Sequence, residues 1–123
     1  MISISREQFE KLVRKALSQL PIDVRNHLDN VDVVVDGSAS TSQLVGTGIE
    51  NEMDLLGLYE GIPLTERYGY DLVLPDKITL FQRPIESICE TQEQVAEEIK
   101  ATIVHEVAHH FGIDDDRLHN LGL

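Results

Sequence analysis

The chain has 123 residues, of which 41% are hydrophobic and 26% are charged, a balance typical of one soluble globular domain spanning residues 1–123. Its formal charge of −12 repels phosphate backbones and argues against nucleic-acid binding. No run approaches the roughly 18 apolar residues of a membrane span, and the N-terminus lacks the basic-then-apolar order of a secretory signal. We therefore expect no membrane association. Because Cys89 is the only cysteine and cannot form an internal disulfide, we also expect a cytoplasmic protein.

The N-terminal part contains one predicted helix and one predicted strand. Ser5 and Gln8 have the spacing of a capping box, and the apolar residues before Pro21 have helical spacing: Phe9, Leu12, Val13, Ala16, Leu17 and Leu20. The β-branched run 31–35 ends at Asp36-Gly37, which predicts a buried strand. Residues 36–48 are small, polar and glycine-rich, which predicts a loop.

The C-terminal part predicts two strands and a long helix. Residues 55–59 have the composition of a short strand, and 77–82 alternate in polarity as a half-exposed strand does. Pro84 favours a helical turn after it. Thr91 and Gln94 form a second capping box, so a helix should run from about residue 92 to 111 and end at Gly112. This order of elements predicts an α+β domain with the last helix beneath a small sheet.

The predicted long helix contains His105, Glu106 and His109. Histidines four residues apart lie one above the other on a helix face, so both imidazoles can bind one ion at about 2.0–2.1 Å. Glu106 is rotated by about 100° from His105, where it can reach a water on the metal without being a ligand itself. A hydrolase needs this arrangement, because the metal polarises a carbonyl and acidifies its water while the carboxylate takes the proton. The three residues therefore predict a metal-dependent hydrolase.

A catalytic site of this kind needs a third protein ligand, and the residues after His109 offer five candidates: His110, Asp114, Asp115, Asp116 and His119. His110 points one helical step away from the pair. Gly112 permits a left-handed turn that folds the chain back, and Asp115 stands three residues beyond it. This placement favours Asp115 as the ligand and leaves His119 as the reserve, whereas Asp114 and Asp116 suit solvated or helix-capping positions.

Other polar residues are candidates for the surroundings of the metal. Glu98 and Thr102 precede the first histidine on the same helix face, where they would either line a cleft or face solvent. Tyr59, Tyr68 and Tyr70 are candidate donors to an oxyanion, although no signal in the sequence places any of them near the metal.

These features resemble the small bacterial zincin-like metallopeptidases, also described as minimal zincins. The resemblance rests on residues 58–64 (LYEGIPL) with Arg67, 75–81 (PDKITLF), 83–86 (RPIE) and the tail 105–122 (HEVAHHFGIDDDRLHNLG), which contains the signature HExxHxxGxxD. It implies a compact zincin-like domain, in which a small mixed sheet packs on the active-site helix. It also implies that an edge strand, assigned here to residues 77–83, lines the cleft and pairs with an extended peptide.

The same resemblance implies roles for individual residues. His105, His109 and Asp115 look like the ligands of one zinc ion, and Glu106 looks like the general base of a zinc metallopeptidase that acts on a peptide or protein. A site with two histidines and one carboxylate would also accept iron, cobalt or manganese. The substrate sequence and the oligomeric state are left open.

Three alternatives compete with a peptidase. The first is metal-dependent hydrolysis of a non-peptide substrate such as RNA, which the acidic surface and Glu106 disfavour. The second is a non-catalytic domain whose zinc fastens the C-terminal tail, because structural zinc sites in model peptides supply about 10–16 kcal/mol. The third is an adaptor that binds no metal.

Overall fold

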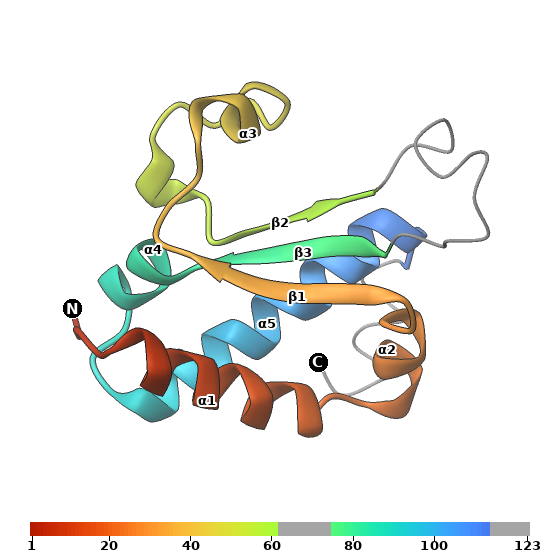
Figure 1. The fold of residues 1–123 in the computed structure, drawn as a ribbon, viewed down its shortest axis with the longest axis horizontal. Coiled ribbons are helices and arrows are strands. Elements are labelled where there is room, and N and C mark those ends of the chain that lie inside the picture. The colour runs from red at the N-terminus through yellow and green to blue at the C-terminus, as the bar shows by residue number, and fades with distance from the viewer. Residues whose placement is uncertain (62–74, 114–123) are drawn as a thin grey trace.

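The computed structural model of the chain describes residues 1–61 and 75–113. Its elements in chain order are α1 (Arg6–Ser18), α2 (Ile22–His27), β1 (Val31–Asp36), α3 (Thr41–Val45), the 3-10 turn η1 (Glu52–Asp54), β2 (Gly57–Glu60), β3 (Asp76–Phe81), α4 (Gln82–Ser87) and α5 (Gln92–Phe111). Figure 1 shows the sheet at the centre, with α1 and α5 on one side and α3 on the other. The predicted α+β class, with a small mixed sheet, a long helix against it and an N-terminal helix, is confirmed.

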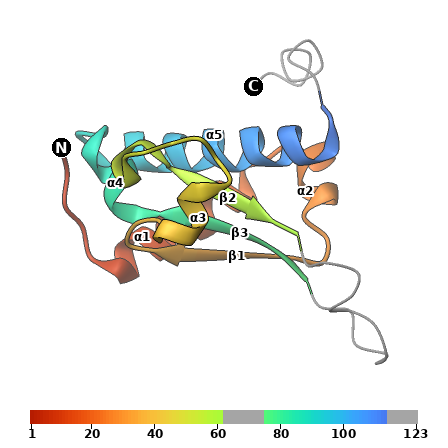
Figure 2. The ribbon, with the colours of Figure 1, turned by 90° about the horizontal axis from the view of Figure 1, so that it is seen from above.

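In residues 1–61 and 75–113 the sheet has three strands, in the order β1-β3-β2. β1 runs parallel to β3, and β2 runs antiparallel to it. The prediction that residues 77–83 form the edge strand is wrong, because β3 has a partner on each side and is therefore the central strand. Within the described residues β2 is an edge strand, and it is the one that lies along α5 (Figure 2).

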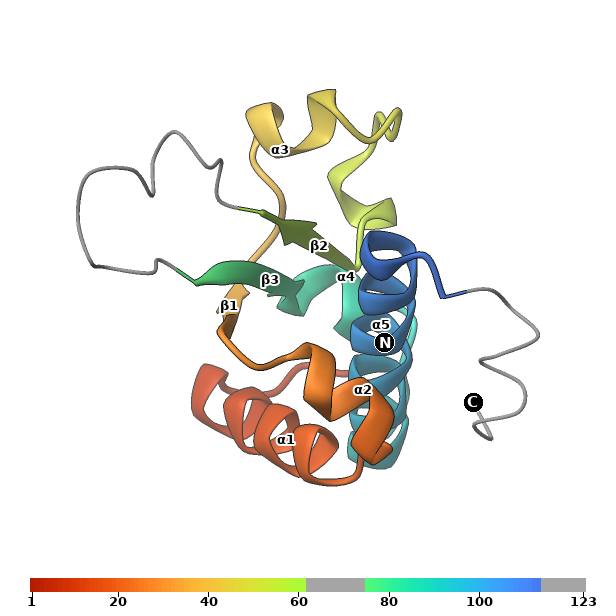
Figure 3. The same cartoon turned by 90° about the vertical axis from the view of Figure 1, so that its right-hand side faces the viewer.

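The main core fills the space between the sheet and the helices α1 and α5. It is built from one face of each element: Phe9, Val13 and Ala16 of α1, Ile78 and Leu80 of β3, and Val95, Ile99, Ile103 and Val107 of α5. Figure 3 shows α1 and α3 at opposite ends of the molecule, with the sheet between them. The core therefore lies on the face of the sheet that α3 does not cover.

β3 is more buried than its alternating sequence predicts. Ile78 and Leu80 belong to the main core, whereas Thr79 and Phe81 are buried on the other face. A second apolar cluster covers that face and consists of Ala39, Leu55 and Phe81, with Leu44, Ile49 and Leu58 packed against them. Alternation shows which side chains share a face of the strand, but it carries no information about what covers each face.

β1 is half-buried, so the prediction of a buried strand is wrong. Its residues alternate between partly buried and exposed, and Val34 is on the exposed side. Val31, Val33 and Val35 pack against the main core. A run of β-branched residues fits either kind of strand, so the run alone could not distinguish them.

The segment 36–48, predicted as a loop, contains the short helix α3. Gln43 N donates a hydrogen bond to Ser40 Oγ at 3.2 Å, and Ser40 N donates one to Gln43 Oε1 at 2.9 Å. This capping box explains why the helix starts here. The sequence predicted a loop because the residues around the capping box are small and polar. Gln43 Nε2 also donates to Glu60 Oε1 at 3.1 Å, which fastens α3 to the edge strand β2.

The predicted start of α1 and both predicted ends of α5 are confirmed. Gln8 N donates to Ser5 Oγ at 3.1 Å at the start of α1. At the start of α5, Gln94 N donates to Thr91 Oγ1 at 3.1 Å, and the helix ends where Gly112 adopts a left-handed conformation with a φ of 70°. Among the described residues no helix is long and apolar enough to cross a membrane.

Candidate metal centre

Two of the predicted metal ligands lie on the exposed side of α5. His105 and His109 are exposed, whereas Val107 and Ala108 between them are buried. Within residues 1–61 and 75–113 neither imidazole has a hydrogen bond, an ion pair or a ring contact. Two exposed imidazoles with free ring nitrogens, one helical turn apart, are a donor pair that fits a zinc ion.

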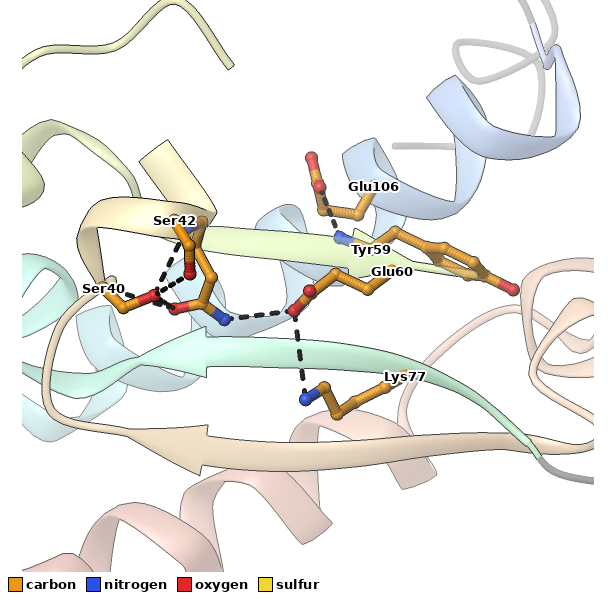
Figure 4. Close-up of polar contacts among 7 residues, drawn as sticks. Ser40, Ser42, Tyr59, Glu60, Lys77 and Glu106 are labelled. Atoms are coloured by element: carbon orange, nitrogen blue, oxygen red, sulfur yellow. Dashed lines mark hydrogen bonds and ion pairs between the residues drawn. The ribbon is translucent and has the colours of Figure 1, made fainter. Parts of the chain in front are cut away.

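Glu106 lies on a different side of the same helix and reaches the edge of the sheet. It is half-buried, and its Oε1 accepts a hydrogen bond from the main-chain N of Tyr59 at 2.9 Å (Figure 4). Glu106 therefore contacts the sheet, whereas the two histidines lie on a more exposed side of the helix, as a rotation of about 100° per residue requires.

A cleft of about 170 Å³ opens between β2 and α5. One wall is the first residue of β2 with the two residues before it, and the other is one side of α5. The lining residues are Leu55, Leu56 and Gly57 opposite Glu98, Thr102, His105 and Glu106. Glu98 and Thr102 thus line a cleft, which was one of their two predicted settings, and Thr102 is buried rather than open to solvent. One imidazole and the carboxylate of the predicted site face the same small space.

β2 lies directly against α5 because residue 57 is a glycine. A Cβ atom at this position would lie 2.5 Å from Cγ2 of Thr102 and 3.1 Å from the carbonyl oxygen of Thr79. Any larger side chain at residue 57 would therefore push the strand away from the helix. A glycine inside a strand pattern indicates that another element approaches closely, but the sequence does not say which element.

Tyr59 is a residue of the site whose placement the sequence did not predict. Its hydroxyl donates a hydrogen bond to Oδ2 of Asp76 at 2.7 Å. Its ring stacks on His110, with 3.8 Å between ring centroids and 18° between ring planes. The hydroxyl considered as an oxyanion donor is therefore bound to Asp76, while Tyr68 and Tyr70 lie outside the described residues.

The third metal ligand cannot be located in the described part of the chain. Within residues 1–61 and 75–113 no three His, Cys, Asp or Glu side chains form a group that could hold a metal. His110 stacks on Tyr59 instead of joining the histidine pair. Asp115 and its alternatives all lie outside the described residues, namely Asp114, Asp116 and His119. Asp115 therefore stays a prediction.

A family model described as zincin-like metallopeptidase matches residues 28–123. The chain belongs to the zincin-like metallopeptidase family. No curated protein matches it. The zincin-like span includes all three strands, the cleft and α5, whereas α1 and α2 precede it. The resemblance inferred from the sequence is confirmed, and α1 and α2 both pack against α5.

Proposed function

We propose that the protein is a zinc-dependent peptidase. His105, His109 and Asp115 hold one zinc ion, and Glu106 is the general base. The observation that carries this proposal is the position of the Glu106 carboxylate, which lies at the edge strand, in the cleft that His105 also lines. The family supports a metallopeptidase in general, and this geometry supports the assignment of roles to individual residues.

The residues divide the chemistry between them. When bound, zinc supplies a Lewis acid that polarises the scissile carbonyl and makes water easier to deprotonate. Glu106 Oε1 accepts from the Tyr59 amide, and Oε2 has no hydrogen bond within the described residues. Oε2 is therefore the atom that takes the proton from the attacking water and passes it to the leaving amine. His105 and His109 would hold the ion near this carboxylate, because they lie within one helical turn of Glu106 on α5.

The substrate we propose is an extended peptide that lies along β2. The odd-numbered residues of the strand have their main-chain groups on the side away from β3, as the bond from Tyr59 N to Glu106 shows. An extended peptide can add to such an edge through main-chain hydrogen bonds, which align it without requiring a particular sequence. Gly57 is the residue of β2 that lines the cleft, so the peptide pairs there.

The test is cleavage of a peptide library by the zinc-loaded protein and by its Glu106→Gln variant. Removal of the general base should lower kcat about 10²- to 10⁴-fold without loss of zinc. Glu97→Gln is the matched control, because Glu97 is an exposed glutamate of α5 that lines no part of this cleft. Equal cleavage by the wild-type and Glu106→Gln proteins would refute the mechanism.

A further inference from the structure

We infer that Tyr59 is a positioning residue, whose main-chain N–H fixes the carboxylate of Glu106 at the edge of the cleft. The inference rests on the proposed function, because it assigns a partner to the proposed general base. It starts from one contact, the 2.9 Å hydrogen bond from Tyr59 N to Glu106 Oε1. In Figure 4 the carboxylate of Glu106 reaches from α5 to the backbone of β2 at Tyr59.

The contact belongs to a regular match between the strand and the helix. Gly57 lies against Thr102, Tyr59 binds Glu106, and Gly61 lies near His110, so each step of two residues along the strand meets a step of four along the helix. Two strand residues rise about 6.6–6.8 Å, and four helical residues rise about 6.0 Å. Because these two distances are nearly equal, every second residue of the strand lies beside the same side of α5, one helical turn after another.

The side chain of Tyr59 stabilises this alignment of strand and helix through two contacts, one from its hydroxyl and one from its ring. Its hydroxyl donates to Asp76 of β3 at 2.7 Å, and its ring stacks on His110 at 3.8 Å. The first contact ties Tyr59 to the central strand, and the second ties it to α5 one residue beyond His109. Gly57 adds a third constraint, because only a residue without a Cβ lets the strand lie against Thr102. The amide of Tyr59 is thus fixed relative to the helix that carries Glu106.

This arrangement has a chemical consequence. One carboxylate oxygen of Glu106 is bound to the strand, so the side chain is held in one rotamer with the other oxygen left for the proton. Without the amide the carboxylate would sample several rotamers, and only a fraction of molecules would place it correctly. The bound amide is also unavailable to a peptide, which confines main-chain pairing to the Gly57 side of the strand.

The first experiment measures hydrogen exchange of the Tyr59 amide by NMR in the metal-free protein. A hydrogen bond to a charged group contributes about 1.5–3 kcal/mol, so Glu106→Ala should speed this exchange about 10- to 100-fold. Glu106→Gln keeps a carbonyl acceptor and should retain most of the protection. The amide of Ile78 in the central strand is the internal control. Unchanged exchange at Tyr59 in Glu106→Ala would overturn the inference.

The second experiment removes the amide hydrogen itself. Tyr59→Pro lacks the N–H, while Tyr59→Ala keeps it, and both lose the aromatic ring; an edge strand tolerates proline where its N–H points outward. The proline variant should show a kcat about 10- to 100-fold below that of the alanine variant. The two variants should have the same KM and the same affinity for zinc. Equal kcat values, or a matching loss of zinc affinity, would overturn the inference. A wild-type protein that cleaves nothing would instead refute the proposed function, since the exchange measurement needs no activity.

Discussion

Substitution of Gly57 by alanine tests the packing that places the edge strand on α5. The new Cβ would lie 2.5 Å from Cγ2 of Thr102 and 3.1 Å from the carbonyl oxygen of Thr79. Carbon atoms in protein interiors pack at about 3.5–4.0 Å, so the strand and the helix must separate locally by about 1 Å. Thr102 is buried, and it lines the cleft between β2 and α5.

The expected cost follows from the size of this overlap. Overpacking of a close contact lowers the free energy of unfolding by about 1–3 kcal/mol, and we expect about 2 kcal/mol for Gly57→Ala. For a chain of this length that corresponds to a fall in Tm of about 8 °C. Thr102→Ser removes the clashing methyl group and should cost about 1 kcal/mol alone. In the double variant the missing methyl group of residue 102 leaves room for the new Cβ of residue 57. The close distance from that Cβ to the carbonyl oxygen of Thr79 remains.

Urea denaturation of the four proteins in this double-mutant cycle measures the effect. The double variant should be at least as stable as Gly57→Ala, which corresponds to a favourable interaction energy of about 1 kcal/mol. The reasoning is wrong if Gly57→Ala lies within about 0.5 kcal/mol of the wild type, or if the two single costs simply add. Either result would mean that β2 does not depend on Gly57 to approach α5.

Three further predictions concern the helix, the cysteine and the metal. Thr91→Ala removes the hydroxyl that accepts from Gln94 N and should cost about 1 kcal/mol in thermal melts, whereas no change would mean that this cap does not stabilise α5. Burial, and then the negative charge of Glu98, raises the pKa of the Cys89 thiol above its ordinary value of 9.0. The folded protein therefore holds this proton more tightly than the unfolded chain, so its stability should fall as the pH rises above about 9, and Cys89→Ala should lack that part of the fall. Removal of zinc by a chelator should lower Tm but leave the circular-dichroism spectrum of a folded protein, because His105 and His109 lie outside the core; collapse of the fold would favour a structural zinc instead.

Local signals in the sequence predicted the helix α5 well. Thr91 and Gln94 fix where α5 begins, and Gly112 fixes where it ends, because these effects act within a few residues of the chain. The spacing of His105, Glu106 and His109 then determines which side chains share a face, since the helical period is constant. The same reasoning failed at α3, where the capping box at Ser40 stood among small polar residues that also suit a loop.

Long-range features were beyond reach of the sequence. The family resemblance assigned residues 77–83 to an edge strand, yet residues 76–81 form the central strand, because pairing with β1 and β2 depends on segments far away in the chain. The bond between Tyr59 and Glu106 joins residues 47 positions apart, and no local pattern encodes that register. Gly57 was the only related signal that we identify in the sequence. A glycine in a strand indicates that another element packs closely against it, but does not identify that element.

The most direct test of the proposed zinc site is an anomalous-diffraction map from crystals of the protein purified with zinc. We predict a single ion about 2.0–2.1 Å from a ring nitrogen of His105 and of His109, and about 2.0–2.2 Å from a carboxylate oxygen of Asp115. The Glu106 carboxylate should lie close by without binding the ion. A protein that takes up no metal, or an ion bound away from the two histidines, would contradict the account.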